Sequence, residues 1–120
     1  MNNKKLGTAF ERFVCADFAH RGYWTHFITP DMRGSQPFDI VAVKDNKAIA
    51  VECKTLDAKE HIFPLTRLEE NQLMAFKRWM ACGNDTPIIV VSWRGKIYWL
   101  PFTALQNEKR IDLNDVASVG

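Results

Sequence analysis

Residues 37–55, PFDIVAVKDNKAIAVECKT, decide the fold of this chain. They contain two stretches rich in apolar and β-branched residues, Phe38 to Val43 and Ala48 to Thr55. The polar run 44–47 between them is prone to form a turn. Two strand-like segments joined by a short polar turn predict a β-hairpin.

This hairpin is expected to place two carboxylates opposite each other. A turn centred on Asp45 and Asn46 puts Asp39 across from Glu52, with Cβ atoms about 4.5–5.5 Å apart. Like charges so placed destabilise a sheet unless something compensates them, and a divalent cation does so. Because side chains alternate along a strand, Lys54 shares the face of Glu52. The spacing therefore predicts two metal-binding acids beside a lysine that stabilises a phosphate or holds the attacking water.

Two predicted helices contribute further polar residues. Apolar residues at helical spacing predict a first helix over residues 5–20, and Glu11 borders its apolar side. A second helix is predicted to begin at a capping box formed by Thr66 and Glu69. Gln72 lies on the apolar stripe of that helix, where a buried amide needs a partner. A satisfied core amide and a residue of the site are equally good interpretations of Gln72.

The remaining patterns complete an α/β fold, a mixed central β-sheet flanked by helices. Its 120 residues suit one domain, with a core over about 6–105 and a polar, partly disordered tail over 106–120. The other predicted segments are strands at 23–28, 87–93 and 96–100, a loop at 29–37, irregular chain at 55–65 and a helical turn at 102–105.

Composition restricts the class of protein. A net charge of +2 is only mildly basic, which suits a nuclease whose acidic metal site offsets a basic DNA-contacting face. No apolar run is long enough to span a membrane, and the first residues contain no apolar leader segment. The three cysteines form no paired motif, so neither a disulfide framework nor a zinc site is expected. A reducing, cytoplasmic location is the simplest expectation.

Each acidic residue has a simpler explanation when it is taken alone. A Glu-x-Lys pattern on a strand usually forms a solvated face, Asp39 alone suits a turn cap, and Glu11 alone suits an exposed helix position. The combination is more specific, because the hairpin register brings the acids together and the strand period adds Lys54. Asp31, which follows a proline, lies outside the hairpin and is not favoured.

The whole set of motifs resembles the PD-(D/E)xK nucleases and, among them, the Holliday junction resolvases of the RecU and archaeal Hjc type. The resemblance covers residues 6–105. It implies a restriction-endonuclease-like core and a homodimer that binds four-way DNA junctions and cuts two strands symmetrically with Mg²⁺. Mn²⁺ is a possible substitute, and no small-molecule cofactor or membrane partner is implied. The matching segments are Gly7 to Arg12, Pro37 to Asp39, Glu52 to Lys54, Phe63 to Leu65, Gln72 and Ile97 to Pro101.

The resemblance also implies a role for each site residue. By position, Glu11, Asp39 and Glu52 are metal-site acids, Lys54 is the catalytic lysine and Gln72 is a supporting catalytic residue. RecU proteins are longer, with an extended N-terminal region and a stalk that engages the junction centre. Here only Thr29 to Gln36 could occupy the region of that stalk.

Basic residues near the predicted site are candidate DNA phosphate contacts, although each one alone also suits a solvated surface charge. Two other functions stay open. One is a restriction-like or repair nuclease acting on duplex or flap DNA, and the other is a non-catalytic DNA-binding module on a nuclease fold. Intact acids and lysine argue against the module. The candidate contacts are Lys4, Lys5, Arg12, Arg33, Lys59, His61 and Arg67.

Overall fold

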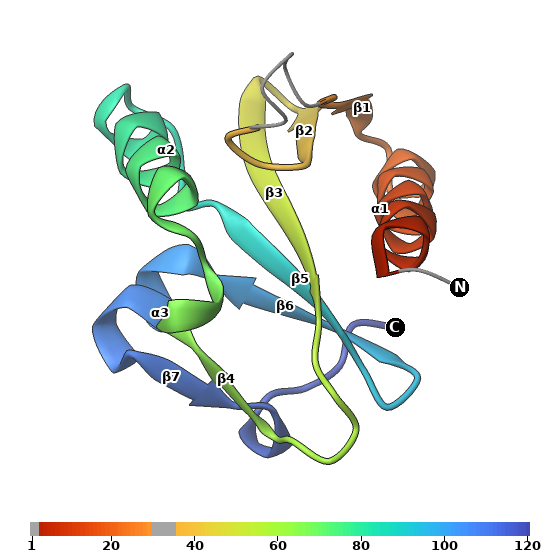
Figure 1. The fold of residues 1–120 in the computed structure, drawn as a ribbon. Coiled ribbons are helices and arrows are strands. Elements are labelled where there is room, and N and C mark those ends of the chain that lie inside the picture. The colour runs from red at the N-terminus through yellow and green to blue at the C-terminus, as the bar shows by residue number, and fades with distance from the viewer. Residues whose placement is uncertain (1–2, 30–35) are drawn as a thin grey trace.

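The computed structural model describes residues 3–29 and 36–120, with side chains from residue 9 onward in those ranges. Two β-sheets and three α-helices make up the described chain (Figure 1). In chain order the elements are α1 (Asn3–His20), β1 (Trp24–Phe27), β2 (Ile40–Lys44), β3 (Lys47–Thr55), β4 (Ile62–Pro64), η1 (Leu65–Arg67), α2 (Glu70–Ala81), β5 (Ile88–Trp93), β6 (Lys96–Pro101), α3 (Phe102–Glu108), β7 (Arg110–Asp112) and η2 (Leu113–Asp115).

The larger sheet is mixed and has five strands in the order β1-β2-β3-β5-β6. Only β3 and β5 pair in parallel, whereas the other neighbours are antiparallel. A parallel pair needs a long crossover connection, which here includes α2. β5 is buried between two neighbouring strands, as its continuous apolar sequence predicts.

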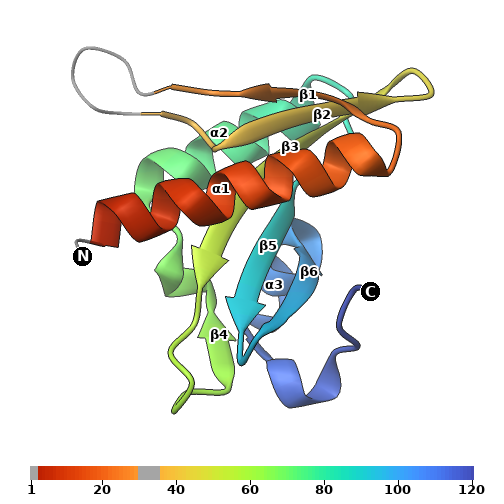
Figure 2. The ribbon, with the colours of Figure 1, turned by 90° about the vertical axis from the view of Figure 1, so that its right-hand side faces the viewer.

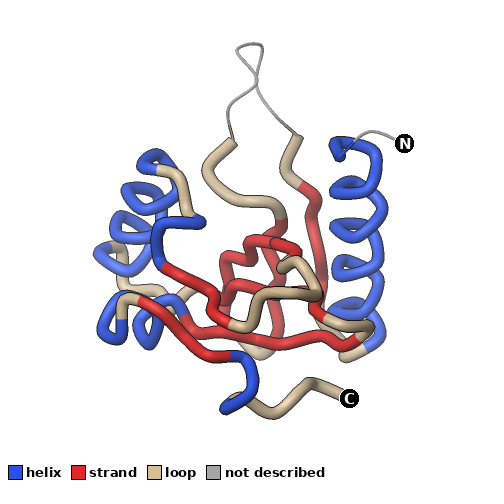
Figure 3. The backbone as a smooth tube through the Cα atoms, turned by 60° about the horizontal axis from the view of Figure 1, so that its bottom comes forward, coloured by secondary structure: helices blue, strands red, loops and turns tan. Residues whose placement is uncertain are grey.

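Helices cover the two faces of this sheet. α1 lies against one face, and α2 and α3 lie on the other, so that the strands form the middle layer (Figures 2 and 3). Phe18 and Val14 of α1 pack with Val51 and Val90 on the first face. The second face has the larger core. Its fully buried large side chains include Phe63, Phe76, Phe102, Ile89, Leu100, Leu105 and Leu113.

The predicted register of the first hairpin is confirmed. Val43 pairs with Ala48 and Val41 with Ala50, and the two turn residues between the strands have positive φ angles of 53° and 63°. Such angles at both central positions are those of the tight turn that suits the twist of a hairpin. β2 is shorter than predicted, because the paired ladder ends at Ile40 and the chain bends just before it.

The predicted start of the second helix is wrong. Thr66 lies in η1, after which Leu68 is extended and buried in the core. Glu69 is the N-cap, and its side chain forms a capping box with Gln72. The reason is tertiary, because the insertion of Leu68 into the core keeps the chain extended until Glu69.

The segment expected to be a polar tail also differs from its prediction. β7 pairs with β4, which lies in the segment predicted to be irregular, and α3 extends to Glu108. Leu113 of η2 is 1% exposed and belongs to the larger core, so the expectation of disorder is wrong for residues 110–115. A buried leucine holds this polar segment against the body of the protein. No helix of the described ranges is long and apolar enough to cross a membrane.

Candidate active site

Asp39 lies at the point where β2 bends away from β3. Its backbone N–H donates to the Val51 carbonyl oxygen at 3.0 Å, and its carbonyl accepts from the Ile28 N–H at 2.8 Å. One step further along β3, the N–H of Cys53 donates to Oδ2 of Asp39 at 2.8 Å. The regular pairing of β2 with β3 has ended here, and the Asp39 carboxylate accepts the Cys53 N–H in place of a backbone carbonyl. This hydrogen bond holds the Asp39 side chain against β3.

Glu52 comes from the neighbouring strand and is 3% exposed. Its Oε2 accepts a hydrogen bond from the amide of Gln72 at 2.5 Å and lies 3.4 Å from Nζ of Lys54. Its Oε1 is buried and has no hydrogen-bond partner. The structure thus brings Lys54 and Gln72 to the same carboxylate. Gln72 is both a satisfied core amide and a contact of the site, since its own oxygen accepts from the Glu69 N–H.

The carboxyl groups of Asp39 and Glu52 lie close enough together that each affects the pKa of the other. Burial, together with the charge of Asp39, raises the pKa of Glu52 to about 8. Burial also raises the pKa of Asp39, against the opposing effect of the Cys53 N–H. In the metal-free protein the raised pKa therefore favours the protonated form of Glu52 at neutral pH. The two acids lie close together, although the regular pairing of the hairpin ends at Ile40 and Val51, before the predicted pair of Asp39 and Glu52.

Glu11 approaches this pair from α1. Burial and the negative charge of Asp39 raise the pKa of Glu11 to about 7, while the positive charge of Lys54 opposes the shift. Glu11 is half-buried, and its pKa responds to the charges of both Asp39 and Lys54. Its assignment as a third metal-site acid stays a prediction.

The donor set of the hairpin suits a hard divalent cation. Two carboxyl groups meet in a buried place, and one oxygen of Glu52 has no other partner. Mg²⁺ is commonly held by one or two carboxylates and keeps several waters or substrate phosphates. Within the described ranges, no three His, Cys, Asp or Glu side chains lie close enough together to form a metal-ligand cluster. The residues present therefore fit an ion that is held mainly by Asp39 and Glu52.

Gln36 is a contact of the site that the sequence did not reveal. Its side-chain amide donates to Oδ1 of Asp39 at 2.5 Å. The backbone carbonyl oxygen of Gln36 accepts from the side chain of Asn71, at the start of α2, at 3.3 Å. In the sequence, Gln36 is a side-chain amide three residues before Asp39. Its contact with Asp39 could not be predicted without the path of the loop.

The candidate DNA contacts fall into three groups. Lys4 and Lys5 lie in α1 with side chains outside the described part, and Arg33 lies outside the described residues altogether. Arg12 and Lys59 are exposed. The other two have partners within the protein. His61 pairs with Asp112 at 3.1 Å, and Arg67 donates to the Thr55 carbonyl and lies over the Phe63 ring.

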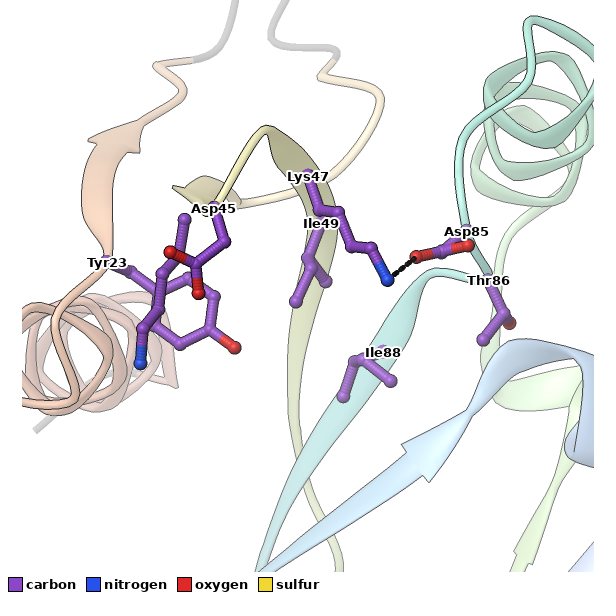
Figure 4. Close-up of a pocket in the computed structure, with 8 residues that line it drawn as sticks. Tyr23, Asp45, Lys47, Ile49, Asp85, Thr86 and Ile88 are labelled. Atoms are coloured by element: carbon purple, nitrogen blue, oxygen red, sulfur yellow. Dashed lines mark ion pairs between the residues drawn. The ribbon is translucent and has the colours of Figure 1, made fainter.

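A surface depression of about 540 Å³ lies away from the carboxylates, at the opposite end of β3 (Figure 4). Ile49 and Ile88 line it, and Lys47 and Asp85 face each other across it at 4.0 Å. None of the predicted site residues lines this depression. The candidate site is therefore the carboxylate pair, and this hollow is separate from it.

The fold is similar to that of Hjc, a Holliday junction resolvase from the archaeal hyperthermophile Archaeoglobus fulgidus. The two structures superpose with a TM-score of 0.67 and 23% sequence identity, over 90% of this chain and 89% of that chain. No protein-family model matches the sequence, and no curated protein matches it significantly. The similarity confirms the predicted fold class, a mixed sheet flanked by helices, and confirms the resemblance to the Hjc type at the level of the fold.

Proposed function

We propose that this chain is a divalent-metal-dependent DNA endonuclease that hydrolyses phosphodiester bonds. The observation that carries the proposal is the carboxyl pair of Asp39 and Glu52, buried together with Lys54 beside it. Such a pair is costly for a fold to maintain. It is explained if the two side chains act together as ligands of a cation that also binds a phosphate.

Each residue of the site has a chemical task in this proposal. Asp39 and Glu52 hold the ion, with Glu11 assisting from α1. When bound, Mg²⁺ acts as a Lewis acid and lowers the pKa of a coordinated water. Lys54, with a side chain 19% exposed, presents its charge at the edge of the site, where it stabilises negative charge that develops on the phosphate. Gln72 orients Glu52 through its amide.

The proposed substrate is a four-way DNA junction, cut symmetrically by a homodimer. The fold shared with the Hjc resolvase supports this choice over other nuclease substrates. In this proposal two chains are needed, because two cuts in opposed strands require two sites. Mn²⁺ is expected to replace Mg²⁺, and a cytoplasmic location remains part of the proposal.

The test compares a labelled four-way junction with a linear duplex of matched sequence, with and without Mg²⁺. Glu52→Ala is the site variant, and Glu108→Ala, an exposed glutamate at the end of α3, is the matched control. Paired cuts in the junction alone, abolished by Glu52→Ala and retained by Glu108→Ala, are expected. Junction binding is expected to survive in both variants, since only the metal site is altered.

Other outcomes would redirect the proposal. Equal cutting of both substrates would keep the active site and reject junction selectivity. Normal turnover by Glu52→Ala would reject the site itself. Binding without any cutting by the wild-type protein would identify a non-catalytic DNA-binding module.

A further inference from the structure

We infer that Gln36 is a positioning residue that holds Asp39 in the orientation needed to bind the metal ion. The inference rests on the proposed function, because it gives Asp39 the task of a metal ligand. It adds a residue that neither the motif spacing nor the resemblance assigned.

The contacts of Asp39 fix both of its carboxylate oxygens. Gln36 donates to Oδ1 at 2.5 Å, and the Cys53 N–H donates to Oδ2 at 2.8 Å. Asp39 is 4% exposed, so water does not readily replace either donor. With one donor on each oxygen, the carboxylate cannot rotate without losing a bond. Each oxygen still has a free lone pair, which a cation needs.

Gln36 is in turn connected to α2. The backbone carbonyl oxygen of Gln36 accepts from the Asn71 side chain at 3.3 Å. The next residue of the helix, Gln72, donates to Glu52 at 2.5 Å. Two neighbouring residues in the first turn of α2 therefore reach the two carboxylates, one directly and the other through Gln36. This arrangement sets the position of Asp39 relative to Glu52.

The chemistry of an amide suits this task. A neutral N–H donor favours the ionised form of Asp39, the form that binds a cation, and adds no charge that would repel the ion. Outer contacts that orient metal ligands typically contribute about 10–100-fold in metal affinity or activity. An apolar side chain of similar length would fill the same space without donating.

The test uses Gln36→Met and, as matched control, Gln106→Met on α3. Calorimetric titration with Mg²⁺ and junction cleavage over a range of Mg²⁺ are measured on both variants and on the wild type. Gln36→Met is expected to bind Mg²⁺ about 10–100-fold more weakly and to regain much of its cleavage rate at high Mg²⁺. Its junction affinity without metal is expected to stay at the wild-type value. Gln106→Met is expected to match the wild type throughout.

The outcomes separate this inference from the proposed function. A wild-type protein that neither binds Mg²⁺ nor cuts DNA would overturn both. Metal-dependent cutting by the wild type, with unchanged Mg²⁺ affinity in Gln36→Met, would overturn the inference alone. If Gln36→Met does not fold, Gln36→Asn replaces it. This variant keeps an amide in the loop but is one methylene too short to reach Asp39, and retained Mg²⁺ affinity would again reject the inference.

Discussion

Ionisation of Glu52 places a negative charge in the buried interior of the protein. The protonation of this residue therefore affects the free energy of unfolding. Its pKa is raised from 4.5 to about 8, mainly by burial. A group whose pKa is raised in the folded state contributes most stability below its unfolded pKa and loses that contribution as pH rises through the folded value. The metal-free protein is therefore expected to lose stability between about pH 4.5 and pH 8.

Glu52→Gln is expected to reduce this loss. One pKa unit corresponds to about 1.4 kcal/mol, so the contribution of Glu52 is on the order of a few kcal/mol. Urea unfolding with a chelator present, from pH 4.5 to pH 9, measures it, and Glu108→Gln is the exposed control. A smaller dependence of stability on pH is expected to remain in Glu52→Gln, because the pKa of Glu11 is also raised, to about 7. An identical slope in wild type and Glu52→Gln would show that Glu52 does not hold the proton.

At the scale of elements, the start of α2 links helix stability to the geometry of the site. Glu69 caps the helix, and Gln72 serves both the cap and Glu52. The first turn of α2 therefore has two roles. It caps the N-terminus of the helix, and it places the side-chain amide of Gln72 against the carboxylate of Glu52.

Glu69→Ala is expected to destabilise the protein by about 1 kcal/mol, because it removes the side-chain acceptor of the helix N-terminus. Thr66→Ala is the matched control and is expected to change stability by less than about 0.5 kcal/mol, since Thr66 is exposed and lies before the cap. Urea unfolding at fixed pH compares the two variants. A larger loss in Thr66→Ala than in Glu69→Ala would place the helix start at Thr66 instead.

For the whole molecule, the proposed chemistry depends on the number of sites in the assembly. The described part of the 13.8 kDa chain holds one candidate site, at Asp39 and Glu52, so symmetric cutting of two strands is proposed to need two chains. Sedimentation at micromolar concentration is expected to give twice the mass of the chain, with both cuts made within the lifetime of one complex. Paired cuts made by a monomeric protein would contradict the proposal of a homodimer. Single nicks in the junction would indicate that each chain acts independently.

Local patterns were sufficient to predict the centre of the site. Strand alternation and the turn at Asp45 and Asn46 specify which side chains meet, because both depend on residues close in the chain. The spacing therefore predicted that Asp39 and Glu52 lie near each other with Lys54 close by, and the observed ladder has the predicted register from Ile40 to Lys44.

What surrounds that centre was decided by contacts between distant parts of the chain. Gln36 reaches Asp39 only because its loop meets the first turn of α2, and β7 exists only because it pairs with β4. The start of α2 moved to Glu70 because burial of Leu68 outweighs the local preference for a cap at Thr66. The sequence by itself determined the hairpin and the acidic residues that come together at its end, since these follow from short-range backbone geometry. Only the tertiary structure decided which side chains contact these acidic residues, because such contacts are set by the packing of the core.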